Sequence, residues 1–183
     1  MIEVKNHEAI CARPIVLIGM MGAGKSSLGL RLAEALHLPF VDADSEIEKA
    51  AAMTIAEIFD RHGEAAFRDG ERRVIKRLLD DLPIVLALGG GAFMNDETRA
   101  LVQEKALSVW LDVPVDELVR RVKKKPDKRP LLKGQNVEAK LVELMQIRAP
   151  IYSHAALKLD VGGGSHEQAV EKIIQAIDTH YAA

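Results

Sequence analysis

The residues best suited to chemistry in this sequence form a glycine-rich run from Gly19 to Ser27. Its pattern, G-x-x-x-x-G-K-S, lies between an apolar run at 14–18 and a segment with a leucine at every fourth position, which predicts a strand, a tight loop and a helix. Glycines leave backbone N–H groups open to a phosphate, and the positive end of the helix dipole favours the anion. We therefore expect a loop that binds the phosphates of a nucleotide.

Each polar residue of this loop has an expected role. Lys25 supplies a cation that can follow the β- and γ-phosphates, and Ser26 supplies a hydroxyl for the magnesium ion that accompanies the nucleotide. The residues expected to bind the nucleotide are Gly22, Ala23, Gly24, Lys25, Ser26 and Ser27. The alternative is a glycine-rich turn that binds nothing, and the complete motif between a strand and a helix argues against it.

Size and composition favour a single domain, 1–183, built around one core. The chain has 183 residues, a net charge of -2 and 48% hydrophobic residues, so it gives no indication of nucleic-acid or membrane binding. The single cysteine, Cys11, cannot form an intrachain disulfide, and the N-terminal extension at 1–13 lacks the apolar run of a signal peptide. We expect a cytoplasmic monomer that binds neither nucleic acid nor membranes.

Apolar runs alternate with amphipathic segments along the rest of the chain. Strands are predicted at 14–18, 40–42, 84–88, 107–111 and 157–161. Helices are predicted at 25–36, from Ser45 with a capping box to Glu48, at 54–79 with a break at Gly63, and at 96–105, 114–122, 137–149 and 166–180. This alternation predicts a parallel sheet covered by helices on both faces.

Carboxylates and glycines follow two of these strands. Asp42 and Asp44 come at the end of the second strand, and 89–91 is a run of three glycines directly after the third. Ligands bind at the carboxyl ends of such strands, and phosphoryl transfer uses carboxylates to hold a metal and to accept a proton. Alternatively, the aspartates only begin a helix and the glycines only form a flexible turn.

Two arginines and one basic loop have more than one interpretation. Arg68 has Glu64 and Glu71 on the same helix face, and the residues alone favour a surface ion pair worth about 0.3–0.5 kcal/mol. Arg148 suits the C-terminal end of a helix. The basic, proline-containing segment 123–134 predicts an exposed loop, either a charged surface, a nucleic-acid patch or a lid over ATP. The loop has no interleaved aromatic residues, which disfavours nucleic acid.

Taken together, these segments resemble the shikimate kinase family from about Pro14 to the C-terminus. The matching motifs, in order, are GMMGAGKSS, FVDADSEIE, FRDGE at 67–71, LGGGA at 88–92, KRPLL at 128–132 and RAPIY at 148–152. The resemblance implies a three-layer αβα P-loop fold with strand order 2-3-1-4-5 and a mobile lid at about 123–134. It also implies transfer of the γ-phosphoryl of ATP to the 3-hydroxyl of shikimate, a step toward chorismate and the aromatic amino acids.

The resemblance further implies a role for each candidate residue. Mg²⁺ is held by Ser26 and, through water, by Asp42. The residues expected to touch shikimate are Asp44, Arg68, Gly90, Gly91 and Arg148, of which the two arginines grip its carboxylate. Arg129 reaches the phosphates from the lid, and Arg120 or Arg121 flanks the adenine. The expected catalytic residues are Lys25, Asp44 and Arg129.

Two other functions are compatible with part of this pattern. A related small-molecule kinase such as gluconate kinase shares the phosphate loop. The discriminator is the pair Arg68 and Arg148, both placed to hold a compact carboxylate, together with the pocket at Asp44, Gly90 and Gly91. A nucleotide-binding regulatory protein without catalysis would have replaced Lys25, Asp44 or Arg129, and all three are present.

Overall fold

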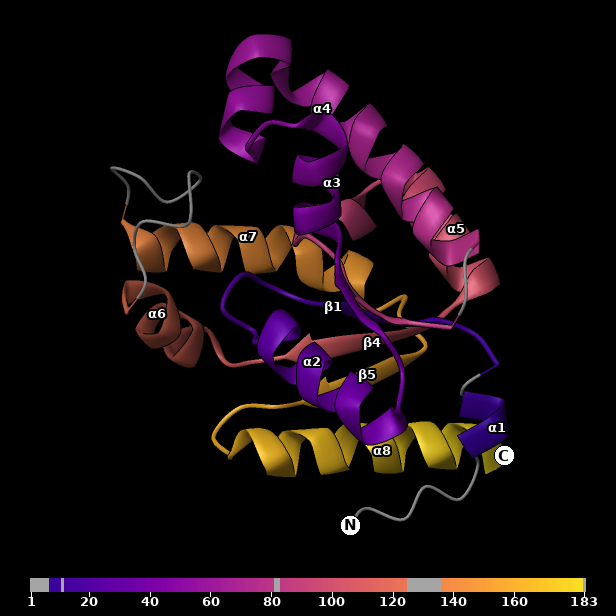
Figure 1. Ribbon diagram of the computed structural model, residues 1–183. Helices are drawn as coiled ribbons and strands as arrows, with labels where there is room; N and C mark the ends of the chain where they lie inside the picture. The colour runs from indigo at the N-terminus through magenta and orange to yellow at the C-terminus, as the bar shows by residue number, and fades with distance from the viewer. Residues whose placement is uncertain (1–6, 11, 81–82, 125–135, 183) are drawn as a thin grey trace.

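A computed structural model of the chain describes residues 7–10, 12–80, 83–124 and 136–182 (Figure 1). The strands are β1 (Ile15–Ile18), β2 (Phe40–Asp42), β3 (Val85–Ala87), β4 (Leu107–Asp112) and β5 (Leu157–Asp160). The helices are α1 (His7–Ile10), α2 (Lys25–Leu36), α3 (Ala43–Ala51), α4 (Ile55–Asp80), α5 (Asp96–Lys105), α6 (Val115–Lys123), α7 (Val137–Tyr152) and α8 (His166–Ala182), with a short 3-10 helix η1 (Ala92–Met94).

The strands form one parallel sheet in the order β2-β3-β1-β4-β5, which confirms the predicted order. Ile15 pairs with Val85 on one side and with Leu107 on the other. Asp42 pairs with Ala87, so the loops that follow β1, β2 and β3 open at the same edge. Helices α2 and α8 pack together on one side of the sheet, and α7 lies on the other (Figure 1).

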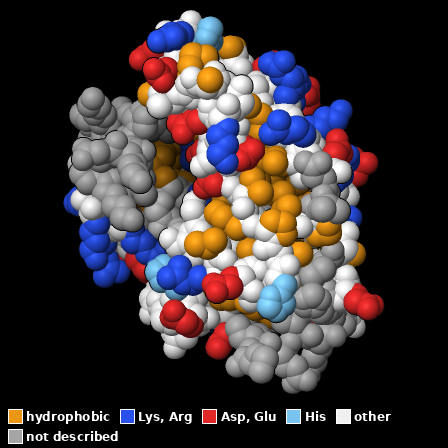
Figure 2. Space-filling model, in the orientation of Figure 1, with side chains coloured by type: hydrophobic (Ala, Val, Ile, Leu, Met, Phe, Trp, Pro, Cys, Tyr) orange, Lys and Arg blue, Asp and Glu red, His pale blue; other side chains and the backbone are white. Residues whose placement is uncertain are grey.

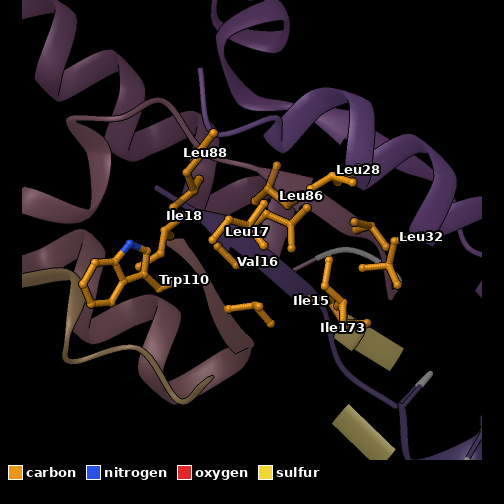
Figure 3. Close-up of a cluster of buried hydrophobic side chains, with 14 of the residues drawn as sticks. Ile15, Val16, Leu17, Ile18, Leu28, Leu32, Leu86, Leu88, Trp110 and Ile173 are labelled. Atoms are coloured by element: carbon orange, nitrogen blue, oxygen red, sulfur yellow. The ribbon is translucent and has the colours of Figure 1, made fainter. Parts of the chain in front are cut away.

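The central strand β1 is the core of the molecule. All four of its residues are buried, because both faces of a parallel sheet are covered by helices. Figure 3 shows β1 among Leu86 and Leu88 from the β3 segment, Leu28 and Leu32 from α2, and Ile173 from α8. The loop that follows β1 is therefore anchored on the most deeply buried strand.

Helix α3 begins earlier than the proposed capping box. Asp42, not Ser45, is its N-cap residue, and the carboxylate of Asp42 accepts hydrogen bonds from the backbone N–H groups of Asp44 (3.1 Å) and Ser45 (3.3 Å). Glu48 instead accepts from the backbone N–H of Ile55 at 2.9 Å. The capping-box prediction was wrong because Asp42 lies closer to the strand end and supplies the same type of acceptor.

Helix α7 does not stop before Pro150 as predicted. It continues to Tyr152 with Pro150 inside it. A proline there removes one backbone hydrogen bond and costs about 3 kcal/mol. The last turn is held by other contacts, since the side chain of Tyr152 is fully buried and the N–H of Ser153 donates to the carbonyl of Ala149 at 2.9 Å. The predicted break at Gly63 is confirmed by its non-helical φ of 79° and ψ of 172° within α4.

The N-terminal extension is partly integrated into the fold. Ile10 is fully buried in the main core, and α1 packs on α8. No helix in the described part of the chain is long and apolar enough to cross a membrane. Among the described residues on the face shown in Figure 2, basic and acidic side chains are interspersed.

Candidate active site

The phosphate loop connects β1 to α2. Gly24 is the N-cap residue of α2 in a left-handed conformation (φ 92°), which favours glycine. The ammonium of Lys25 lies over the loop, where it donates to the carbonyls of Gly19 (2.9 Å) and Met20 (3.1 Å). The cation is thus already positioned beside the backbone that would surround a phosphate.

Ser26 and Asp42 meet across the end of the sheet. The Ser26 hydroxyl donates to Oδ2 of Asp42 at 2.7 Å, while Oδ1 of Asp42 caps α3. The N-cap role therefore fixes the carboxylate and directs its second oxygen toward the phosphate loop. A hydroxyl and one carboxylate are the type of oxygen ligands that Mg²⁺ takes together with phosphates and water.

The three glycines after β3 are each in contact with a different polar side chain. A Cβ atom added at Gly89 would lie 2.7 Å from Oδ1 of Asp44, and one at Gly90 would lie 2.8 Å from Nη1 of Arg148. A Cβ at Gly91 would lie 2.8 Å from Nη2 of Arg68. We call residues 89–91 the glycine loop. Its lack of side chains lets one carboxylate and two guanidinium groups converge on one short stretch of backbone.

Asp44 lies between the phosphate loop and the glycine loop. Burial raises the pKa of its carboxyl group above the usual value, and the nearby Asp42 raises it further, while Lys25 and Arg68 act in the opposite direction. A carboxylate whose pKa is raised by burial is a stronger base than a solvated one. Its position suits a general base that takes the proton of a substrate hydroxyl.

Arg68 is held by a buried carboxylate. Its Nη1 lies 2.7 Å from Oε2 of Glu71, which is 3% exposed, and its Nη2 lies 3.5 Å from the exposed Glu64. Burial raises the pKa of Glu71, against the opposing effect of Arg68. The ion pair that the sequence indicated therefore exists, but it is not only a surface pair, since it holds the guanidinium against Gly91. Glu71 was not predicted as a site residue.

Arg148 is buried although it carries a charge. Its side chain is 8% exposed, and among the described residues no group accepts a hydrogen bond from its Nη1. A buried charged donor without an acceptor is costly. The same Nη1 lies beside Gly90, so an anionic ligand over the glycine loop would supply the missing acceptor. The helix-end interpretation of Arg148 is incomplete, because α7 continues past it for another turn.

A cavity of about 730 Å³ lies between the phosphate loop and the glycine loop. The phosphate loop, Asp42, Asp44, Gly89 and Gly90 line one part of it, and Arg68 and Arg148 reach the glycine loop from outside this lining. The lining also includes residues that were not predicted as site residues, Val161, Gly164, Ser165, His166 and Ala169. These follow β5, the edge strand next to β4, so strand order rather than a motif brings them to the site.

Arg121, not Arg120, lines this cavity. It forms an ion pair with Glu117 and donates to the carbonyls of Gly22 (3.3 Å) and Ala23 (3.4 Å). Arg120 is exposed. Arg129 and most of the predicted lid lie outside the described residues.

Comparison with known proteins identifies the family. A family model described as shikimate kinase matches residues 21–178. A shikimate kinase of Bradyrhizobium diazoefficiens is 54% identical over 97% of this chain and 86% of its own length, and one of Caulobacter vibrioides is 55% identical over 93% and 85%. A solved structure of shikimate kinase from Acinetobacter baumannii in complex with shikimate has a TM-score of 0.88 at 36% identity and covers 95% of this chain and 98% of that one. The chain belongs to the shikimate kinase family.

Proposed function

We propose that the chain transfers the γ-phosphoryl of ATP to the 3-hydroxyl of shikimate, giving shikimate 3-phosphate and ADP. The observation that carries this function is the glycine loop, where Asp44, Arg68 and Arg148 converge beside the phosphate loop. A carboxylate-bearing ring can be held there by two guanidinium groups while one of its hydroxyls meets Asp44. Family membership and the solved relative that holds shikimate support the same substrate.

On the ATP side of the reaction, the protein acts through backbone groups and a cation and forms no covalent bond to the phosphoryl group. Charge on the transferring phosphoryl is spread over its oxygens, so the protein's contribution is positioning and electrostatic stabilisation. The phosphates are surrounded by Gly22, Ala23, Gly24, Ser26 and Ser27. Lys25 shifts toward the β- and γ-phosphates. Mg²⁺ would be held by Ser26 directly and by Asp42 through water, and it would neutralise charge on the phosphates.

The acceptor side of the reaction places a hydroxyl against a base. Arg68 and Arg148 hold the carboxylate of shikimate, and a planar guanidinium fork gives that carboxylate a defined direction. Gly90 and Gly91 allow the ring to lie against the backbone. Asp44 accepts the proton of the 3-hydroxyl as the oxygen–phosphorus bond forms and ADP leaves.

The test of this function is ADP release with shikimate, gluconate and nucleoside monophosphates supplied separately as acceptors. We expect turnover with shikimate alone, its loss on chelation of the metal, and its return with added Mg²⁺. Preference for another acceptor would contradict the proposal. A gluconokinase structure from Sinorhizobium meliloti shares the fold, with a TM-score of 0.61 at 16% identity, which makes gluconate the most informative competitor.

Replacement of Arg68 or Arg148 by lysine should weaken shikimate binding and leave ATP binding unchanged. Lysine keeps a positive charge for Glu71 and for the glycine loop but loses the guanidinium fork. A lost charge-assisted hydrogen bond is worth about 1.5–3 kcal/mol, or about 10- to 150-fold in KM for shikimate. Steady-state kinetics with each substrate varied in turn measures both effects. Arg73→Lys is the matched control, since Arg73 is 73% exposed on α4; equal losses for both substrates would make the two arginines structural.

Replacement of Arg129 by alanine should lower kcat much more than it lowers the affinity for ATP. This residue is proposed to stabilise the transferring phosphoryl more strongly than bound ATP, and only such differential binding changes kcat. Steady-state kinetics and direct measurement of ATP affinity separate the two effects. An unchanged kcat would contradict the proposed role of segment 123–134 as a lid and would favour a charged surface loop.

We also propose that the protein is a monomer in the cytoplasm and has no nucleic-acid partner. The single cysteine fits a reducing compartment, and the net charge of -2 gives no indication of nucleic-acid binding. Light scattering coupled to size-exclusion chromatography should give a mass near the 20.1 kDa of one chain.

A further inference from the structure

The last turn of α7 carries two side chains that reach the glycine loop. Arg148 and Tyr152 are four residues apart and therefore lie on the same face of the helix. Both are buried, and both reach the glycine loop at Gly90. Only the continuation of α7 through Pro150 makes this possible, because a helix that ended at Ala149 would leave Tyr152 in a turn.

The hydroxyl of Tyr152 lies between the two loops of the site. It donates to the carbonyl of Gly90 at 2.5 Å and lies 3.4 Å from the carbonyl of Gly19. Gly90 belongs to the glycine loop, where shikimate is proposed to bind, and Gly19 is the first residue of the phosphate loop. A hydroxyl has one proton, so the short contact with Gly90 uses it and the contact with Gly19 is the weaker one.

The carbonyl of Gly19 is shared with the ATP side. It also accepts from the ammonium of Lys25 at 2.9 Å, the cation that must bind phosphates. When phosphate oxygens compete for this ammonium, Gly19 keeps its contact with the Tyr152 hydroxyl, which also holds Gly90. A ligand that orders the phosphate loop therefore also orders the glycine loop through this hydroxyl.

The environment of Tyr152 keeps this contact well defined. Its ring packs against Trp110 on β4, with ring centroids 5.8 Å apart, and its side chain is fully buried. Burial raises the pKa of the hydroxyl, against a smaller opposing effect of Arg148. The hydroxyl therefore stays protonated over the working pH range and acts as a donor.

We propose that Tyr152 is a positioning residue that couples the two substrate sites, by holding the glycine loop at a fixed place relative to the phosphate loop. This inference rests on the proposed function, because it takes ATP and shikimate as the two ligands. Tyr152 does not touch the reacting atoms. Its contribution is the difference between the affinity of one ligand alone and its affinity when the other is bound, and such a coupling must be equal in both directions.

The experiment is calorimetric titration of shikimate with and without a non-hydrolysable ATP analogue, for the parent protein and for Tyr152→Phe. The variant removes one oxygen atom and keeps the ring against Trp110. In the parent protein we expect the analogue to tighten shikimate binding about 5-fold or more, the lower end of common coupling free energies. In Tyr152→Phe we expect that ratio to fall to within about 2-fold of one, with the affinity for the analogue alone unchanged.

The matched control is Tyr181→Phe, which removes the hydroxyl of the other tyrosine in the chain. The Tyr181 hydroxyl is buried on α8 and has no hydrogen-bond partner among the described residues, so its loss should leave the ratio at the parent value. Emission of Trp110, the single tryptophan, provides a second measurement, because its ring packs on Tyr152. Its ligand-induced change should be altered by Tyr152→Phe and retained in Tyr181→Phe.

Three results would overturn the inference. They are an unchanged ratio in Tyr152→Phe, equal weakening of both ligands with the ratio kept, and a parent protein that binds both ligands without coupling. The second of these would show that Tyr152 only stabilises the fold, which a lower Tm would accompany. A parent protein that binds the ATP analogue but not shikimate would instead overturn the proposed function, and the inference with it.

Discussion

Replacement of Lys25 by alanine is expected to remove nearly all turnover, by about 10²–10³-fold or more in kcat. The ammonium already lies on the phosphate loop, where it donates to the carbonyls of Gly19 and Met20. Its charge is needed most when negative charge develops on the transferring phosphoryl, so the loss falls on the transition state rather than on the fold. ADP release in the presence of shikimate measures the effect, and circular dichroism checks that the variant is folded.

Lys49→Ala is the matched control for this variant. Lys49 lies at the end of α3 and its side chain is 74% exposed in an ion pair with Glu46, so its removal should leave kcat unchanged. If Lys25→Ala stays within about tenfold of the parent, a difference of about 1.4 kcal/mol in the barrier, the assignment of the phosphate loop is wrong.

Replacement of Asp44 by asparagine is expected to lower kcat by about 10²–10⁴-fold and to leave ATP binding intact. Asparagine has nearly the same shape, so the oxygen beside Gly89 is kept and the proton acceptor is lost. Part of the loss can come from a misplaced hydroxyl, because phosphoryl transfer with a loose transition state demands little help from a base. A normal shikimate KM together with an unchanged kcat would exclude both roles.

The pH profile separates the base role of Asp44 from a purely geometric one. In the proposed role the carboxylate of Asp44 is the active form, and burial raises its pKa above the usual value. Turnover in the parent protein should therefore fall as the pH is lowered through this raised pKa, earlier than for a solvated aspartate. The residual activity of Asp44→Asn should lack this acid limb. An identical limb in both proteins would assign it to another group.

The sequence was most informative where a local pattern determines the structure. The strand–loop–helix around Lys25 follows from glycine spacing and apolar periodicity, and the structure has β1 and α2 on either side of this loop. The break at Gly63 follows from the same type of local preference. The strand order, by contrast, came from the family resemblance, because no local pattern in this chain specifies which strands are neighbours.

The features that the sequence did not predict depend on contacts between distant segments. Pro150 remains inside α7 because burial of Tyr152 stabilises the turn that follows it, a tertiary effect that outweighs local propensity. Glu71 forms an ion pair with Arg68, and only its buried position distinguishes it from a surface partner. The cavity lining after β5 depends on the position of that strand beside β4. Each of these required the packed structure.

The measurement that tests the central claim most directly is a crystal structure of the protein with shikimate and ADP bound together. We expect the carboxylate of shikimate within hydrogen-bond distance of Arg68 and Arg148, its 3-hydroxyl against Asp44, and its ring over Gly90 and Gly91, with the phosphates of ADP on the loop from Gly22 to Ser27. Shikimate bound away from the glycine loop, or with its carboxylate turned from both arginines, would contradict the account.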